Sequence, residues 1–531
     1  SQSTPATQII PSNISNKSAS ISATTTILNN TITKSSGSAS TSALGTNSGA
    51  TSTTSSTPLP TPTNNPNDNV IVAYWAYWRR GFLAENNLPW TEITHLNFAF
   101  ALVDETFALN FSSENQLILG AMVSYAHANN VNISIAIGGW TGSQYFSTLA
   151  SSSSSRAKFI NSTVSFVNQF KLDGVDIDWE YPGRKGMACN AISPNDTNNF
   201  LALITELRAA LGNDKLLTLA VRGETFDGPD RPISDVSAFA KLVDWVNVMA
   251  YDVSVDDGSG AEWTKLTGPN APFDVPGTTT NQVSFKNAVS NWLNAGMPAS
   301  KMVMGIEFLG RAQKALAPMS SSQYVPRDPV VPQGDQSDQL WADPCPNSKP
   351  AYSGIWSWYG LREQGILTCT LNTTDEGWVR NFDNTTQTPW LYNQGTGIYI
   401  SYDDPQSIYM KIVYIRQQGL RGVMVWDLTE DNGHELLDVV QVIRKESLGG
   451  APSNDCSGGN VSGNNVGGNA SGKDGGGLAL SVGAIAAITL GLAAFFSLLS
   501  FVVQWLKIRA SETVNLHDDG GAMDMDEKDG G

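Results

Sequence analysis

The chain has 531 residues, of which 41% are hydrophobic and 15% charged, and its formal net charge is -17 at pH 7. This length exceeds one ordinary domain, and the acidic balance excludes a nucleic-acid-binding protein because acidic side chains repel phosphates. The Cys and His residues have no spacing typical of a metal site, so no metal or other cofactor is expected.

Residues 1–68 form a segment without a hydrophobic pattern. They contain 31 Ser or Thr and only three charged residues. Such a segment cannot bury a core, so we expect a disordered arm. Its Ser, Thr and Pro content is typical of an O-glycosylated stalk, and a plain disordered tail is the alternative.

Residues 69–447 contain most of the aromatic residues and are expected to form one large domain. Runs rich in β-branched and aromatic residues recur along it, at 70–78, 93–103, 132–140, 173–180, 216–221, 242–251, 302–310 and 420–428. Helical patterns lie between several of these runs, which predicts an α/β fold with a parallel sheet. Eight such units predict a closed (β/α)8 barrel, the TIM barrel.

The stretch at about 310–395, between the seventh and eighth runs, is too long for a loop. It contains Trp, Tyr and Cys, which predicts a small inserted α+β domain. Two of the four Cys residues, Cys345 and Cys369, lie in this stretch. Four Cys allow three disulfide connectivities, and we favour this pair because its members share one segment.

Two further segments and a tail follow the predicted barrel. Residues 448–476 are rich in Gly, Ser and Asn, which predicts a flexible linker. Residues 477–506 contain an uncharged run longer than the ~20 residues needed to cross a bilayer, which predicts one transmembrane helix. Lys507 and Arg509 predict that the acidic tail at 507–531 is cytoplasmic. A lipid-anchor signal would end in its apolar run, whereas hydrophilic residues follow here.

The chain before the predicted span is then extracellular or lumenal. Eleven Asn-x-Ser/Thr sequons fit a secretory route, including those at Asn110, Asn161, Asn195, Asn372 and Asn384. We therefore expect a single-pass membrane protein of the cell surface, with a monomeric barrel outside the cell.

The fourth run lies within the stretch KLDGVDIDWEYPG, residues 171–183, which carries four carboxylates. Side chains alternate along a strand, so Asp176, Asp178 and Glu180 share the face that points into the barrel. Parallel strands are covered on both sides, which excludes a solvated acidic strand, and carboxylates stacked along a strand do not form a calcium-wrapping loop. Crowded carboxylates cannot all ionise, so the pattern predicts a general acid at Glu180, on the rim where barrel active sites lie.

Residues 173–180, DGVDIDWE, resemble the DxxDxDxE signature of family 18 glycoside hydrolases, the chitinases. The resemblance extends over roughly 70–440, with further matching motifs at 134–140 (SIAIGGW), 249–252 (MAYD), 301–311 (KMVMGIEFLGR) and 422–431 (GVMVWDLTED). It implies hydrolysis of the β-1,4 links of chitin, with chitin or chito-oligosaccharides as partners. The order of stalk, barrel and anchor is similar to that of fungal cell-surface chitinases.

The resemblance also implies a role for each matching residue. Glu180 would protonate the glycosidic oxygen, and Asp178 would orient the substrate's N-acetyl group, whose carbonyl oxygen attacks the anomeric carbon. Asp176 would share a proton with Asp178, and Tyr251 would stabilise the intermediate. The resemblance further implies a substrate-binding set, in which Asp173 supports the strand: Tyr74, Phe100, Trp140, Asp173, Met249, Asp252, Trp263, Arg311 and Trp426.

The chain departs from the family pattern at three positions. Ala136 replaces a frequent Ser before the Gly-Gly pair, Leu309 replaces a frequent Tyr, and Glu307 replaces a frequent Pro. Two alternative functions stay open beside a chitinase: a non-catalytic chitin-binding lectin, and an endo-β-N-acetylglucosaminidase that acts on N-glycans.

Overall fold

The computed structural model describes residues 68–228, 231–254, 262–275, 283–320, 322–373 and 377–448. The predicted arm (up to residue 67) and the predicted linker, membrane helix and tail (from residue 449) lie outside these ranges. Among the helices of the described residues, none is both long and apolar enough to cross a membrane. The predicted span at 477–506 was not among them and stays a prediction.

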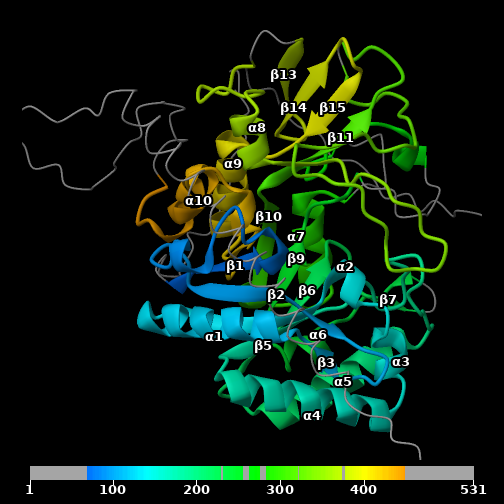
Figure 1. Ribbon diagram of the computed structural model, residues 1–531, viewed down its shortest axis with the longest axis vertical. Coiled ribbons are helices and arrows are strands. Elements are labelled where there is room, and N and C mark those ends of the chain that lie inside the picture. The colour runs from blue at the N-terminus through cyan, green and yellow to red at the C-terminus, as the bar shows by residue number, and fades with distance from the viewer. Residues whose placement is uncertain are drawn as a thin grey trace, which may run out of the picture. The chain divides into compact units, whose positions relative to one another are not determined.

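A closed barrel of eight parallel strands forms the centre of the described part of the chain (Figure 1). Its strands are β1 (Val70–Ala76), β2 (His95–Val103), β4 (Asn132–Gly138), β5 (Gly174–Asp178), β6 (Leu216–Arg222), β9 (Trp245–Met249), β10 (Met302–Glu307) and β16 (Gly422–Trp426). The hydrogen-bonded order is β1-β16-β10-β9-β6-β5-β4-β2, and β2 pairs with β1 to close the ring. The predicted (β/α)8 barrel is confirmed.

Helices follow the strands and cover the outside of the barrel. They are α1 (Ser113–Ala128), α2 (Gly139–Gly142), α3 (Phe146–Ala150), α4 (Ser153–Phe170), α5 (Asp196–Leu211), α6 (Ser237–Ala240), α7 (Phe285–Asn294), α9 (Pro405–Gln417) and α10 (Glu435–Val440). The long ones begin at polar caps; Ser112, for example, accepts a hydrogen bond from the backbone N–H of Asn115 at the start of α1. Three short strands lie outside the ring: β3 (Leu109–Asn110) pairs with β2, and β7 (Asp227–Gly228) pairs with β8 (Arg231–Pro232) in a hairpin.

A second sheet lies between β10 and β16 in the chain and appears at the top of Figure 1. It is antiparallel, in the order β12-β11-β15-β14-β13. Its elements are β11 (Leu309–Lys314), β12 (Ile355–Ser357), α8 (Trp358–Glu363), β13 (Trp378–Asp383), β14 (Thr388–Asn393) and β15 (Ile398–Ser401). Since β11 starts directly after β10, this sheet is attached at the carboxyl rim of the barrel.

Strand β5 shows how the barrel separates apolar from acidic side chains. Trp179, which follows the strand, faces outward and stacks on Phe146, with ring centroids 5.5 Å apart, and contacts Phe200 edge-on at 5.2 Å. Removing this buried indole would cost about 3–5 kcal/mol of stability. Asp176 and Asp178 point the other way, into the barrel, as the alternation predicts.

The predicted disulfide between Cys345 and Cys369 is wrong. Cys345 is bonded to Cys189, 156 residues earlier in the chain, with the two Cα atoms 5.4 Å apart. Cys369 is also disulfide-bonded. The physical reason is the path of the chain: the loop that carries Cys345 leaves the second sheet and reaches the loop after β5, so neighbours in sequence are not neighbours in space.

Candidate active site

Asp176 lies at the bottom of the candidate site and is fully buried. Three neutral donors surround its carboxylate: the Tyr74 hydroxyl at 2.5 Å, the Thr218 hydroxyl at 2.5 Å and the Asn247 amide at 3.0 Å. Burial raises the pKa of Asp176, and these hydrogen bonds oppose the rise. Ala136 lies beside Asp176 in the register of β4 and β5. Both oxygens of Asp176 have donors, so a hydroxyl at position 136 is not needed.

Asp178 and Glu180 follow on the same face. Burial raises the pKa of Asp178 well above its ordinary value, and the charges of Glu180 and Asp176 raise it further. Within the described residues, Oδ1 of Asp178 has no hydrogen-bond partner. Burial raises the pKa of Glu180 to about 7, against a hydrogen bond from Tyr181 that lowers it. This pair therefore retains a proton near neutral pH.

The backbone around these carboxylates is held by the loop after β4. Gly138 has a φ of 116°, and a Cβ there would lie 2.1 Å from the carbonyl oxygen of Asp178, so only glycine fits. The Ser143 hydroxyl accepts a hydrogen bond from the backbone N–H of Glu180 at 2.8 Å. The same hydroxyl lies 3.2 Å from the carbonyl oxygen of Asp178. These contacts fix the peptide that presents the acid.

A polar wall stands beside the acids, at the ends of β9 and β10. Arg311 binds Asp252 through two hydrogen bonds of 2.8 and 2.6 Å. The amide of Asn270 donates to Asp252 at 3.0 Å and to the buried Glu307 at 2.6 Å. Burial raises the pKa of the Tyr251 hydroxyl well above its ordinary value, as do the charges around it. Tyr251 is thus a neutral hydrogen-bond donor next to the carboxylates.

Aromatic rings line the site from β1, β2 and β16. The ring of Trp426 stacks on Phe100 with centroids 5.7 Å apart and meets Tyr74 edge-on at 5.5 Å. Trp78, just after β1, stacks on Phe100 at 6.0 Å and is 53% exposed. Met249 packs against the same interior cluster. A half-exposed aromatic surface beside two buried carboxyl groups that retain a proton suits a ring-shaped, partly apolar substrate such as a sugar.

The comparisons with known proteins agree with this geometry. The family model described as "Glycosyl hydrolases family 18" matches residues 70–431. The chain belongs to glycosyl hydrolase family 18. It is 34% identical to a "chitinase-like effector" of Moniliophthora roreri, over 71% of this chain and 93% of that protein. A crystal structure of a chitinase from Rhizomucor miehei superimposes with a TM-score of 0.65 at 36% identity, over 71% of this chain and 100% of that one.

A second solved relative was crystallised with a ligand. It is a mutant of the class V chitinase of Nicotiana tobaccum in complex with NAG4, 25% identical to this chain. It covers 72% of this chain and 99% of its own length, with a TM-score of 0.58. The match to family 18 at residues 70–431 includes all eight strands of the barrel.

One residue of the predicted substrate-binding set lies at the opposite end of the barrel. Asp173 precedes β5 at the amino end of the barrel, where its carboxylate accepts hydrogen bonds from the Ile133 backbone at 2.8 Å and from His127 at 2.9 Å. This end lies opposite the carboxyl rim, so the assignment of Asp173 to the substrate-binding set is wrong, whereas its predicted role in supporting the strand agrees with its bond to the backbone of β4. The side chain of Trp263 lies outside the described residues.

The other predicted residues lie at the carboxyl rim or in the barrel beneath it. Trp140 follows β4, is 41% exposed, and donates a hydrogen bond from Nε1 to Asp343 at 3.1 Å. Leu309, one of the departures from the family pattern, is buried in β11 at 3% exposure and replaces a hydroxyl with core packing. Among the described residues, no group of three or more His, Cys, Asp or Glu could hold a metal ion.

Sequence reasoning missed several residues of this family 18 site. Thr218 and Asn247 could have been found from the sequence, because each is a polar residue inside an apolar strand. Thr218 lies in β6, which pairs with β5, and Asn247 lies in β9, which pairs with β6. Trp78 had a weaker signal, as an aromatic residue directly after a strand that already carried Tyr74. Asn270 had none, since it lies in a loop and its two partners are distant in sequence.

Proposed function

We propose that this chain is a chitinase that hydrolyses the β-1,4 links between N-acetylglucosamine units of chitin. The observation that carries the proposal is the pair Asp178 and Glu180 at the carboxyl rim. Burial is the first cause that raises the pKa of both groups, the charges of neighbouring carboxylates raise both further, and no cation is among the described groups that set either pKa. An acid that keeps its proton up to a pH of about 7 can serve as a general acid.

The proposed reaction has two steps. Glu180 donates its proton to the glycosidic oxygen while the carbonyl oxygen of the substrate's acetamido group attacks the anomeric carbon, which breaks the glycosidic bond. Asp178 accepts a hydrogen bond from the acetamido N–H, and the Tyr251 hydroxyl donates to the group that carries the developing charge. Water then attacks the anomeric carbon of the oxazolinium ion and gives its proton to Glu180. The configuration is retained without an enzyme nucleophile.

The remaining residues would bind the sugars. The Trp426 ring offers an apolar face to the reacting sugar, and Phe100 and Trp78 continue that surface. The wall formed by Asp252, Arg311 and Asn270 would present fixed polar groups to the sugar substituents. The NAG4 complex of the tobacco relative supports an oligosaccharide as ligand.

A binding function without catalysis is the alternative that the experiment must separate, because one relative is named a chitinase-like effector. The test compares N-acetylchitotetraose, its fully deacetylated counterpart and an N-glycosylated protein. We expect cleavage of the first, with the β-anomer as initial product, and none of the others. Binding without cleavage would indicate a lectin, and release of N-glycans would indicate the endo-β-N-acetylglucosaminidase.

The deacetylated substrate tests the mechanism itself. It lacks the acetamido oxygen, so the proposed attack cannot occur even though the glycosidic bond is the same. Efficient cleavage of this substrate would require an enzyme carboxylate as nucleophile and would contradict the role of Asp178.

We infer that the barrel acts outside the cell, attached by the span predicted at 477–506. The sequons support this inference, because the side chains of Asn110, Asn161, Asn195, Asn372 and Asn384 are all exposed and accessible to glycosylation. Truncation after residue 476 should release an active, glycosylated enzyme into the medium. Retention of the truncated protein on the membrane would contradict the inference.

A further inference from the structure

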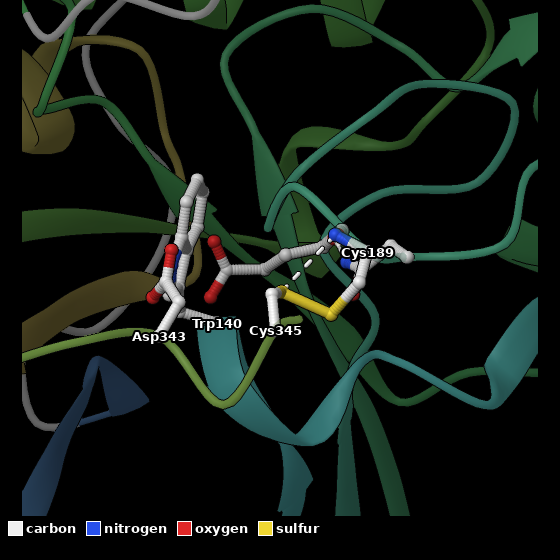
Figure 2. Close-up of a disulfide and its surroundings, with 6 residues drawn as sticks. Trp140, Cys189, Asp343 and Cys345 are labelled. Carbon is white, nitrogen blue, oxygen red and sulfur yellow. Dashed lines mark hydrogen bonds between the residues drawn. A yellow bond between two sulfur atoms is a disulfide. The ribbon is translucent and has the colours of Figure 1, made fainter. Parts of the chain in front are cut away.

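A loop of the second sheet touches two segments of the active-site rim. Its base is the backbone pairing of Trp341 with Ala351, through hydrogen bonds of 3.0 and 2.9 Å. We call residues 341–351 the bridge loop. Asp343 in this loop accepts the hydrogen bond from Trp140, and Cys345 forms the disulfide with Cys189 (Figure 2).

The order of the strands shows how far the bridge loop reaches. Around the ring, β10 lies four places from β4, which is the opposite side of an eight-stranded barrel. The second sheet is attached after β10, whereas Trp140 follows β4 and Cys189 follows β5. The bridge loop therefore links opposite sides of the carboxyl rim, and its covalent bond holds that link.

The residue next to Cys189 of the disulfide contacts the backbone of Glu180 directly. Asn190, next to Cys189, is 8% exposed and donates its side-chain amide to the carbonyl oxygen of Glu180 at 3.0 Å. A Cβ at Gly186 would lie 2.2 Å from the same oxygen, so this loop lies directly on the peptide of the acid. With Ser143 on the N–H side, the Glu180 backbone is held from two directions.

We propose that the bridge loop is a positioning device for the hydrolase proposed above, on which this inference rests. Its disulfide fixes the backbone of Glu180 through Asn190, and its Asp343 fixes the ring of Trp140. In Figure 2, Asp343 lies beside the Trp140 ring and the disulfide joins the same loop to Cys189. One element thus sets both the proton donor and a sugar-binding surface.

Both effects have a physical basis. A proton donor must stay within hydrogen-bond reach of the glycosidic oxygen, and a displacement of about 1 Å can cost on the order of 100-fold in rate. The exposed Trp140 ring would otherwise lose its rotational freedom when a sugar binds. The bond to Asp343 orders the ring before the substrate arrives.

The two halves of the device predict different kinetic changes. In the full-length protein, Cys189→Ser with Cys345→Ser should lower kcat about tenfold and change KM little, because the acid is displaced. The alkaline limb of its pH profile should move to lower pH, since water reaches Glu180 more easily. Asp343→Ala should instead raise KM by about three- to tenfold with little change in kcat. Asp343→Asn retains an oxygen acceptor and should restore the KM.

Matched controls separate positioning from plain stabilisation. Asn190→Ala leaves the disulfide intact and should reproduce the loss of kcat and the shift of the pH limb. Dithiothreitol should lower the kcat of the wild type but not that of the double Cys variant. Both proteins contain the disulfide of Cys369, so reduction of that bond cannot explain a difference between them. If the double variant loses thermal stability but keeps the wild-type kcat and pH profile, the positioning role is wrong.

A binding assay keeps this proposal separate from the proposed function. Calorimetry with N-acetylchitotetraose is done in the Glu180→Gln background, where no turnover is needed. We expect Asp343→Ala to weaken binding about three- to tenfold and Asp343→Asn to bind like the parent. Unchanged binding would overturn the role of Asp343. A wild type that binds but never hydrolyses would overturn the proposed function together with the role of the disulfide, and would leave the role of Asp343 in binding intact.

Discussion

Buried carboxylates at two places in this molecule have opposite surroundings. Asp176 and Asp178 line the interior of the barrel, and burial is the first cause of their raised pKa values. Asp403, just before α9, is equally buried at 2% exposure. It forms an ion pair with Lys411, whose side chain is completely buried.

The comparison shows that the partner of a buried carboxylate decides whether the group stays ionised or holds a proton. Burial raises the pKa of Asp403 too, but the charge of Lys411 opposes the rise. That carboxylate can stay ionised and hold α9 in place. Asp178, next to Glu180, has no such cation among the described groups that determine its pKa. A carboxylate in that position can hold a proton, which suits chemistry rather than structure.

Replacement of the acid should have the largest effect on activity. Glu180→Gln keeps the size of the side chain and removes the proton donor, so we expect kcat to fall about 10²- to 10⁴-fold. The free energy of unfolding should change little below about pH 4.5, where Glu180 is uncharged whether the chain is folded or unfolded. Steady-state kinetics and urea unfolding measure the two quantities. Activity within tenfold of the wild type would exclude Glu180 as the general acid.

The reverse result is expected at the structural ion pair. Lys411→Met leaves Asp403 buried without its cation and should lower the free energy of unfolding by about 3–5 kcal/mol. The kcat of the folded fraction should stay near the wild-type value. The matched control is Lys411→Met combined with Asp403→Leu, which removes both charges and should recover much of the loss. A stable single variant with low kcat would reverse the comparison.

The pH dependence should show the difference directly. The Glu180 pKa of about 7 predicts that kcat/KM falls as the pH rises through about 7, because the acid loses its proton. Since this folded-state pKa is above the ordinary value of 4.5, the contribution of Glu180 to stability is full below about pH 4.5 and is lost as the pH rises through about 7. Glu180→Gln should remove this part of the pH dependence of unfolding.

Substitution of Tyr181, which is next to Glu180, should move the alkaline limb of the kcat/KM profile to higher pH. Tyr181 donates a hydrogen bond that lowers the pKa of Glu180. Tyr181→Phe should therefore raise this pKa and move the alkaline limb of kcat/KM to higher pH. A limb that moves to lower pH, or stays fixed, would mean that another group controls it.

The sequence predicted the barrel and its inward carboxylates because both depend on local patterns. Each strand is a short apolar run, and the two-residue period of β5 alone separates Asp176 and Asp178 from the outward-facing Trp179. The predicted strand positions differ from the observed ones by only a few residues for the same reason.

The features that could not be predicted depend on contacts between distant segments. The pairing of Cys345 with Cys189 follows from the route of the bridge loop around the rim, for which the neighbouring residues carry no pattern. The bonds from Asn270 to Asp252 and Glu307 likewise join a loop to two strands. In such cases the tertiary fold, rather than local periodicity, selects the partner.

The smallest effect on activity is expected for Asp173, the residue of the 173–180 motif that lies away from the site. Asp173 and Glu180 are seven residues apart, so at ~3.3 Å per residue their Cα atoms are at most about 23 Å apart, and they lie beyond opposite ends of β5. Asp173→Asn removes a carboxylate that, within the described residues, hydrogen-bonds to Ile133 and His127. It should cost about 1 kcal/mol of stability and leave kcat/KM within twofold of the wild type.

The same substitution three residues later, Asp176→Asn, should lower kcat by at least about tenfold, because that carboxylate lies beneath Asp178 and Glu180. Equal losses of kcat in both variants would place Asp173 in the catalytic machinery and remove the distinction between the two ends of the strand.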